Sequence, residues 1–299
     1  MKSVILITGA GTGIGKLSAE ALAEAGHIVY ATLRDVNGRN KARADTLRAW
    51  ASNKGVALQP LELDVLSQDS ADAAVATIVK EQGRLDVVMQ NAGHLVMGPT
   101  EAFTPEEIMK VFDTNFLGAQ RVNRAALPQL RQQEHGLMVW ISSSTTKGGF
   151  PPFLGPYGAA KAAMDSLAVS LSYEVARFGI ETSIVVPGAF TRGTEHFPSA
   201  GKPADSNRVA AYERYDGVMD EVGKRLSELT PEHADPQAVA DEIVRIVNLP
   251  AGERPARSVI DFVNDGAEEV IALAEKVRID FAHRIGIADL LTAKVMHKA

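Results

Sequence analysis

The sequence predicts a single α/β domain of the doubly wound type, in which helices cover both faces of a seven-stranded parallel sheet with strand order 3-2-1-4-5-6-7. Three observations lead to this prediction. Short apolar runs alternate with helical patterns, and this alternation forces parallel pairing with right-handed crossovers. The first run, residues 4–7, is apolar throughout, as in strands that are buried on both faces. A glycine-rich turn joins that run directly to the next helical pattern.

Composition limits the class of ligand. The chain has 299 residues, of which 45% are hydrophobic and 23% are charged, as in ordinary soluble globular proteins. The formal net charge of -6 and the lack of a basic tract argue against nucleic acid or an anionic membrane as partner. No apolar run reaches the ~18 residues of a membrane span. Because the chain has no cysteine, we expect no disulfide and no thiolate metal site, and the cytoplasm is the expected compartment. Small molecules are the expected ligands, and no metal is predicted.

The glycine-rich turn follows the first strand. Its glycines allow positive φ angles and let the backbone approach a ligand closely, while the next helix, expected from about Ile14, offers its N-terminus to a pyrophosphate. The glycine pattern alone leaves a purely structural turn possible. The cofactor-binding candidates in this turn are Gly9, Thr12, Gly13, Ile14 and Gly15.

The second strand, residues 27–33, ends where βαβ units meet an adenosine ribose. Leu33 occupies the place where an acid would bind a ribose 2′-hydroxyl, and Arg34 follows it. A guanidinium at this point favours a 2′-phosphate through a charge-assisted contact. We therefore expect NADP(H) to be preferred over NAD(H). The alternative is that Arg34 is a solvated loop charge and Asp35 takes the ribose.

The next strands also end in candidate cofactor contacts. After a helix at 38–54, the third strand, residues 56–63, leads to Asp64 and Val65 on the ligand side of the sheet. Asp64 could instead cap the helix that begins near Gln68. The fourth strand, residues 85–90, breaks at Asn91, Ala92 and Gly93, whose small side chains suit the close passage of a cofactor.

Three further patterns carry polar chemistry. A helix capped by Thr104 contains Asn115, a residue type whose side chain usually bonds nearby backbone. The fifth strand, residues 137–141, ends in a run of serines, which is common loop chemistry. Tyr157 and Lys161 lie four residues apart, on one face of the following helix. A neighbouring ammonium lowers the pKa of a phenol, so such a Tyr can protonate an alkoxide, although the pair taken alone could arise by chance.

Taken together, these motifs resemble the short-chain dehydrogenase/reductase family in order and spacing. The resemblance covers residues 3–192 by motif and extends to about residue 263 by element order, and it implies a Rossmann fold. The stretch 29–35 looks most like the NADP-preferring hydroxysteroid dehydrogenase branch. The motifs are Thr8-Gly9-x3-Gly13-x-Gly15, Asn91-Ala92-Gly93, Asn115, the serines after 141, Tyr157-x3-Lys161 and Pro187-Gly188-x2-Thr191.

The resemblance implies a catalytic mechanism. Nicotinamide would exchange hydride with a carbonyl carbon while Tyr157 donates its proton to the oxygen. Lys161 would lower the pKa of Tyr157 and hold the nicotinamide ribose, and Asn115 would hold a water. Strand register favours Ser143 as the serine on the carbonyl oxygen, whereas the family's usual interval from Tyr157 gives Ser144. Pro187, Gly188 and Thr191 would bind the nicotinamide end, with Thr191 on the carboxamide.

Two rival functions share parts of this pattern. A non-catalytic NADP(H)-binding regulator would need the glycine turn and Arg34, but it gives no reason for serine, tyrosine and lysine to meet. A lyase or epimerase with transient hydride transfer would share the Tyr–Lys pair, but its usual relatives lack the Asn-Ala-Gly turn. The sequence therefore favours an active oxidoreductase of the carbonyl reductase type, expected as a homodimer or homotetramer.

The remaining segments concern the substrate. We expect a helical lid at 192–232 with a mobile hinge at 192–207, in which His196 is more typical of a surface histidine. A helix at 236–249 and a strand at 258–263 follow. Two helices at 268–283 and 287–298 would then close the pocket or pack on a partner subunit. An apolar cleft for a bulky ketone or secondary alcohol is expected, unless its residues are core: Leu95, Val96, Met97, Phe150, Pro151, Pro152, Phe153, Leu154, Phe190 and Phe197.

Overall fold

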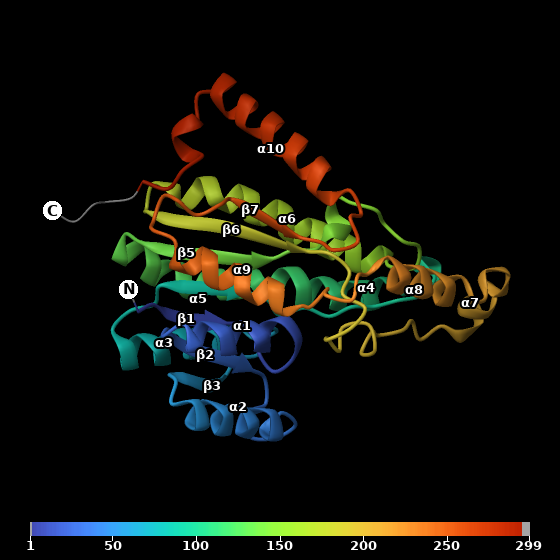
Figure 1. The fold of residues 1–299 in the computed structure, drawn as a ribbon, viewed down its shortest axis with the longest axis horizontal. Helices are drawn as coiled ribbons and strands as arrows, with labels where there is room; N and C mark the ends of the chain where they lie inside the picture. Colours follow the sequence, from blue (N-terminus) through green and yellow to red (C-terminus); the bar gives the residue numbers. More distant parts are fainter. Residues whose placement is uncertain (1, 295–299) are drawn as a thin grey trace.

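The computed structural model describes residues 2–294 and confirms the predicted sheet (Figure 1). Seven parallel strands are hydrogen-bonded in the order β3-β2-β1-β4-β5-β6-β7. The strands are β1 Val4–Ile7, β2 Ile28–Leu33, β3 Leu58–Glu62, β4 Val87–Gln90, β5 Gly136–Ile141, β6 Ile180–Pro187 and β7 Arg257–Ile260. Their carboxyl ends form one edge of the sheet, which is where open α/β sheets bind ligands.

Helices bury both faces of the sheet because successive residues of a strand point to opposite sides. In β1, Leu6 packs with α3 Gln68–Gln82, α5 Gly118–Gln133 and α6 Gly155–Ala176. Ile5 and Ile7 pack on the other side. That second layer is formed by α1 Gly13–Glu24, α2 Lys41–Lys54 and α9 Gln237–Asn248. The largest fully buried side chain, Trp140, lies in the first of these layers.

The helix that carries Asn115 is not uniform. Its first part, α4 Pro105–Phe112, begins at a capping box in which Thr104 and Glu107 exchange side-chain and backbone hydrogen bonds. A π-helical turn, Asp113–Leu117, then joins α4 to α5 and contains Asn115. The sequence predicted the helix and its cap but not the π turn, which typically marks a functional site in a helix.

The lid contains less helix than its length suggests. An irregular loop after β6 leads to α7 Ser206–Ala210, a 3-10 turn Glu213–Tyr215 and α8 Val218–Leu229. Gly201 fixes the base of the lid, because its N–H donates to Leu95 O at 2.9 Å and its carbonyl accepts from Met97 N at 2.8 Å. The lid thus lies over the carboxyl ends of the strands (Figure 1).

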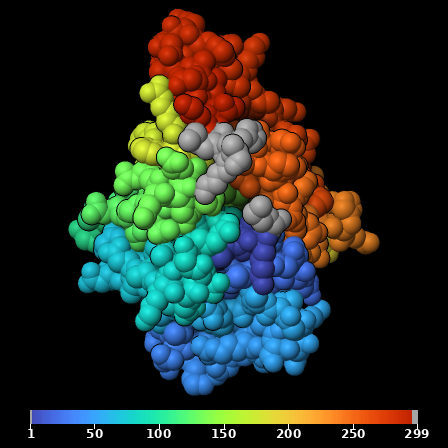
Figure 2. Space-filling view, turned by 90° about the vertical axis from the view of Figure 1, so that its left-hand side faces the viewer, coloured from blue at the N-terminus to red at the C-terminus, as the bar shows by residue number. Residues whose placement is uncertain are grey.

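The prediction of two C-terminal helices is half correct. The first forms as α10 Ala267–Arg284 and rises at the edge of the molecule (Figure 2). The second, predicted at 287–298, is wrong over the described residues, where only a 3-10 turn Ala288–Leu290 forms. Tertiary contacts explain the difference, because Lys294 N donates to Ala176 O at 2.8 Å and Asp289 pairs with Arg177 at the end of α6. Positions 295–298 of the predicted helix lie outside the described residues.

The described helices differ in length, up to the 22 residues of α6. Not one of them, within residues 2–294, combines the length and the apolar character that a bilayer crossing requires.

Candidate active site

A large cavity of about 940 Å³ runs along the carboxyl ends of the strands, from the glycine turn to the lid. It brings together sixteen of the eighteen predicted site residues. Asn115 and Thr191 are not among the lining residues. Those that line it are Gly9, Thr12, Gly13, Ile14, Gly15, Arg34, Asp64, Val65, Asn91, Ala92, Gly93, Ser143, Tyr157, Lys161, Pro187 and Gly188.

The glycine turn is shaped by its neighbour at the end of β4. Gly9 has a φ of 65°, and a Cβ there would lie only 2.9 Å from the Cα of Ala92. The Nδ2 of Asn91 donates to the carbonyls of Thr8 at 2.8 Å and Gly9 at 3.0 Å. Any side chain at Gly15 would collide with that amide. Asn91 therefore braces the turn, and the N-terminus of α1 faces the cavity, where its unpaired N–H groups would suit a diphosphate.

The adenosine end favours Arg34 over Asp35 as the cofactor contact. Both residues are exposed, but only Arg34 lines the cavity. The carboxylate of Asp35 instead accepts the N–H of Arg39 at 2.9 Å, within its own loop. Sequence reasoning missed a second guanidinium, Arg43 in α2, which also lines the cavity and pairs with the lid residue Glu195 at 3.3 Å. The sequence signal that could have identified Arg43 is a basic side chain in the first turn of the helix that follows β2.

The alternative role considered for Asp64 is wrong. Ser67 is the N-cap of α3, and its hydroxyl accepts the N–H of Ser70 at 3.2 Å. Asp64 lines the cavity, and its Oδ1 accepts the N–H of Leu66 at 3.0 Å, so the carboxylate also shapes the turn after β3.

Asn115 is buried, and its amide is used by the protein. Its Nδ2 donates to Val111 O at 2.9 Å and to His94 O at 3.0 Å, while its Oδ1 accepts the N–H of His94 at 3.0 Å. The side chain thus fixes the loop after Gly93 to the helix. The water expected on this residue stays a prediction.

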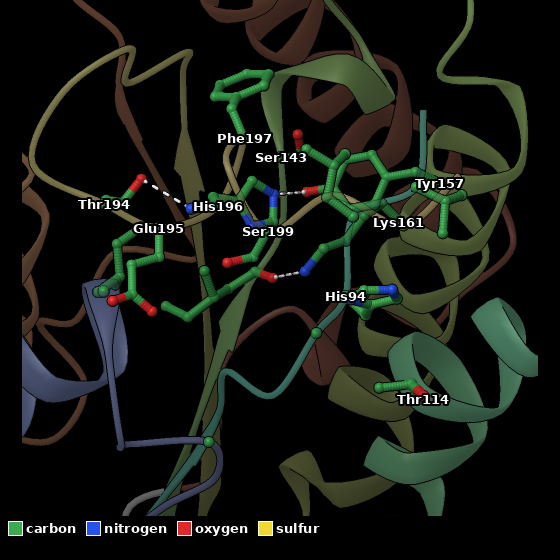
Figure 3. Close-up of a pocket in the computed structure, with 18 of the residues that line it drawn as sticks. His94, Thr114, Ser143, Tyr157, Lys161, Thr194, Glu195, His196, Phe197 and Ser199 are labelled. Atoms are coloured by element: carbon green, nitrogen blue, oxygen red, sulfur yellow. Dashed lines mark hydrogen bonds between the residues drawn. The ribbon is translucent and has the colours of Figure 1, made fainter. Parts of the chain in front are cut away.

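Tyr157 and Lys161 are both buried on one face of α6, as the spacing predicted (Figure 3). The Nζ of Lys161 donates to Ile141 O at 2.8 Å. Burial lowers the pKa of Lys161 to about 8, against the opposing charge of Asp165. Burial also raises the pKa of Tyr157 to about 12. The lowered pKa predicted for Tyr157 is therefore not found in this structure, because desolvation of the phenolate outweighs the contacts that favour it.

The structure separates the adjacent serines by their contacts. Ser142 donates to Asp165 at 2.7 Å, and Ser144 begins a 3-10 turn, Ser144–Thr146. The hydroxyl of Ser143 lies beside the ring of Tyr157 (Figure 3), where it opposes the rise in the pKa of that phenol, and it accepts the hydroxyl of Thr145 at 2.9 Å. Ser143 is the serine whose contacts favour the catalytic assignment.

The sequence did not predict that His196 contacts Tyr157. The residue is exposed, as expected of a surface histidine, yet it also lines the cavity, and its Nε2 lies 3.3 Å from the hydroxyl of Tyr157 (Figure 3). The two rings meet edge to face with centroids 5.6 Å apart. Loss of water around the ring and the charge of Lys161 lower the pKa of His196 to about 4, so the imidazole is neutral. His196 lies in an irregular part of the lid, where no hydrophobic periodicity could have predicted that its side chain faces Tyr157.

Thr191 offers a test of whether a nicotinamide cofactor fits. Its hydroxyl oxygen is buried and has no hydrogen-bond partner among the described residues. An unpaired buried hydroxyl is costly, but Thr191 does not line the cavity, so a ligand amide would reach this hydroxyl only after the loop that follows β6 has moved. The glycine turn and the two guanidiniums fit a nicotinamide dinucleotide lying along the cavity.

Seven of the ten residues predicted to form an apolar cleft line the cavity, together with charged side chains such as Glu107, Lys110 and Lys202. Leu95, Val96, Met97, Pro151, Leu154, Phe190 and Phe197 line it. Phe150, Pro152 and Phe153 do not. Phe150 packs over Gly158 and is largely exposed, while Phe153 meets Tyr215 edge to face at 6.1 Å. The lid adds Met219, Val222 and Leu226 from one face of α8.

Known protein sequences are similar to this chain over most of its length. A family model described as short chain dehydrogenase matches residues 3–202. The 3-ketodihydrosphingosine reductase of Bacteroides thetaiotaomicron is 37% identical over 190 residues, which cover 64% of this chain and 65% of the relative. Estradiol 17-beta-dehydrogenase 1 of Rattus norvegicus is 31% identical over 251 residues, which cover 83% of this chain and 71% of the relative.

Solved structures match over a larger part of the chain. A short-chain dehydrogenase from Streptomyces avermitilis superposes with a TM-score of 0.69 at 29% identity, covering 95% of this chain and 98% of the other. Actinorhodin polyketide ketoreductase with NADPH superposes with a TM-score of 0.70 at 25% identity, covering 88% and 98%.

Proposed function

Because the chain belongs to the short-chain dehydrogenase family, we propose that it is an NADP(H)-dependent oxidoreductase that interconverts a bulky hydrophobic ketone and its secondary alcohol. One observation carries the proposal: a buried Tyr157 and Lys161 share a cavity wall with Ser143, between a diphosphate-binding turn and an apolar pocket. A protein that only binds the cofactor has no use for this group of side chains.

Each side chain has a role that its position supports. The nicotinamide, when bound, supplies or accepts the hydride. With a pKa of about 12, Tyr157 keeps its proton until the carbonyl oxygen gains negative charge, and it then donates that proton as the general acid. Ser143 orients the carbonyl oxygen. Lys161 stabilises the phenolate that forms and holds the nicotinamide ribose, and Asn115 supports the loop that the cofactor passes.

The preference for NADP(H) rests on charge at the adenosine end. Arg34 and Arg43 both line the cavity there, whereas the carboxylate of Asp35 is held by its own loop. A charge-assisted hydrogen bond contributes roughly 1.5 to 3 kcal/mol, or about tenfold to a hundredfold in affinity. The remaining cofactor contacts proposed are those of the glycine turn, Asp64, Val65, Asn91, Ala92, Gly93, Pro187, Gly188 and Thr191.

The substrate class follows from the apolar end of the cavity. Side chains from the loop after β4, from the loop after Phe150 and from α8 face one space, which suits a large apolar molecule with one carbonyl group. The names of the two relatives refer to ketodihydrosphingosine and estradiol, and we infer a substrate of comparable bulk here. A cytoplasmic homodimer or homotetramer remains the expected form.

The test is a panel of ketones and aldehydes with NADPH, run on the wild type and on Tyr157→Phe. The variant keeps the ring and loses the proton donor, so we expect unchanged NADPH affinity and a loss of turnover of roughly 10²- to 10⁴-fold. Near wild-type turnover in the variant would overturn the mechanism. NADPH binding without turnover of any panel member would favour the regulator, and turnover confined to small polar carbonyls would refute the apolar pocket.

A further inference from the structure

Helix α10 carries an exposed apolar stripe. Val270, Leu273, Val277 and Phe281 are 46%, 63%, 59% and 53% exposed, which is high for side chains of this kind. Spacings of three and four residues place them on one face of the helix, distinct from the face that buries Ile271. A contiguous exposed apolar surface on a soluble domain marks an interaction site.

The opposite side of α10 is held on the domain by polar contacts. Glu275 pairs with the guanidinium of Arg257 in β7 at 3.3 Å, and Arg278 donates to the hydroxyl of Tyr173 in α6 at 2.8 Å. These contacts fix the rotation of the helix, so the stripe is presented outward as a rigid surface. Figures 1 and 2 show α10 at the outer edge of the molecule, above α6.

The stripe is separate from the catalytic cavity. Of the residues after β7, the cavity reaches Val263 and Asp265 and includes none of α10. Covering the pocket, one of the two roles considered for the C-terminal extension, is therefore wrong for this helix. Packing against another molecule is the role that remains.

We propose that the stripe packs against the same stripe of a second copy, with the two α10 helices antiparallel about a two-fold axis at Val277. A two-fold interface requires a surface that is complementary to itself. The stripe meets this condition, because Leu273 of one copy would lie opposite Phe281 of the other and Val277 would lie opposite its own copy. The equal four-residue intervals on either side of Val277 give this register.

The charges at the helix ends are also complementary to themselves. The first turn of α10 holds Glu268 and Glu269, and the last turn holds His283 and Arg284. Antiparallel packing in this register brings Arg284 of each copy opposite Val270 of the other, within reach of the neighbouring Glu269. An anionic membrane suits the helix less well, because its four carboxylates outnumber its three permanent cations. These are Glu268, Glu269, Glu275 and Asp280 against Lys276, Arg278 and Arg284.

The absence of cysteine in the sequence allows a direct test by disulfide cross-linking. Val277→Cys should give a covalent dimer on mild oxidation, because the position meets its own copy at the axis. The matched control is Ile279→Cys, which is exposed on the other side of the same helix and should remain uncross-linked. Absence of cross-linking at Val277, or equal cross-linking at both positions, would overturn the proposal.

Mass in solution gives a second, independent measurement. Sedimentation equilibrium should show that Leu273→Glu halves the wild-type mass, whereas Ile279→Glu does not. Arg284→Glu should weaken association, and adding Glu269→Arg should restore it. Circular dichroism and NADPH binding check that each variant is folded. A wild-type mass for Leu273→Glu would contradict the proposal. Binding to vesicles of 3:1 phosphatidylcholine–phosphatidylglycerol tests a membrane as the occupant instead. If Leu273→Glu loses vesicle binding without a change in mass, the stripe binds a membrane and the proposal is wrong.

Discussion

At the scale of single residues, burial sets the protonation of the catalytic pair. Tyr157 has a pKa of about 12 and Lys161 one of about 8, both because the protein removes water from the charged form. This arrangement suits reduction, since a neutral phenol is the form that donates a proton. Helical spacing predicted that the two side chains share a face, but the depth of burial depends on the loops and the lid around them.

The two guanidiniums at the adenosine end lead to a prediction about cofactor choice. We expect Arg34→Asp to reverse the preference from NADP(H) to NAD(H), because it replaces an attraction for the 2′-phosphate by a repulsion and offers an acceptor for a ribose hydroxyl. Arg43→Ala should weaken NADPH binding and leave NADH binding nearly unchanged. Titration of both cofactors by fluorescence measures both effects. Equal affinity of the wild type for the two cofactors would contradict the assignment.

Glu195 supplies the control for Arg43. Its carboxylate pairs with Arg43 across the mouth of the cavity, so it competes with a 2′-phosphate for the same guanidinium. Glu195→Gln should therefore tighten NADPH binding in the wild-type background and have no effect when Arg43 is already alanine. An equal effect in both backgrounds would mean that Glu195 acts through the lid alone.

At the scale of elements, a buried ion pair joins α6 to β7, and Glu275 of α10 contacts the same guanidinium at 3.3 Å. Arg257 donates to both carboxylate oxygens of Asp165, at 2.8 and 2.6 Å, and both side chains are buried. Burial alone would raise the pKa of Asp165, but the hydrogen bonds from Arg257 and Ser142 outweigh it and lower that pKa. The pair therefore contributes stability above the ordinary pKa of an aspartate, and this contribution is lost as pH falls through the lowered value.

Removing one partner tests this pair. Arg257→Met should lower the free energy of unfolding by roughly 3 to 5 kcal/mol near neutral pH, because it leaves a buried carboxylate without its cation. Urea unfolding measures the change. The double variant Asp165→Asn, Arg257→Met removes both charges and should be more stable than Arg257→Met. A double variant as unstable as the single one would show that lost packing, and not an unpaired charge, is responsible.

Local patterns predicted most of the elements, and tertiary contacts decided the rest. The order of the strands and the position of α6 follow from periodicity and turn residues that the sequence displays directly. The helix expected at 287–298 had a suitable pattern, but contacts with the end of α6 hold residues up to Lys294 in another conformation. The contact of His196 with Tyr157 and that of Glu195 with Arg43 join segments far apart in the chain, and no periodicity encodes them.

At the scale of the whole molecule, the cofactor site joins the two halves of the sheet. The cavity is lined from β1 and β2 on one side and from β5 and β6 on the other, with the end of β4 between them. A ligand that bridges both halves stabilises them together, because it binds only when both are folded. Loosening of either half would then be expected to weaken cofactor binding.

We therefore expect one cooperative unfolding transition that NADPH moves as a unit. At a concentration one hundred times its dissociation constant, NADPH should add about 2.7 kcal/mol to the free energy of unfolding. Calorimetry with and without cofactor measures this shift, and NADH at the same concentration serves as the control because its weaker binding should give a smaller one. Two separate transitions, of which NADPH moves only one, would show that the halves of the sheet unfold independently and that the cofactor does not bridge them.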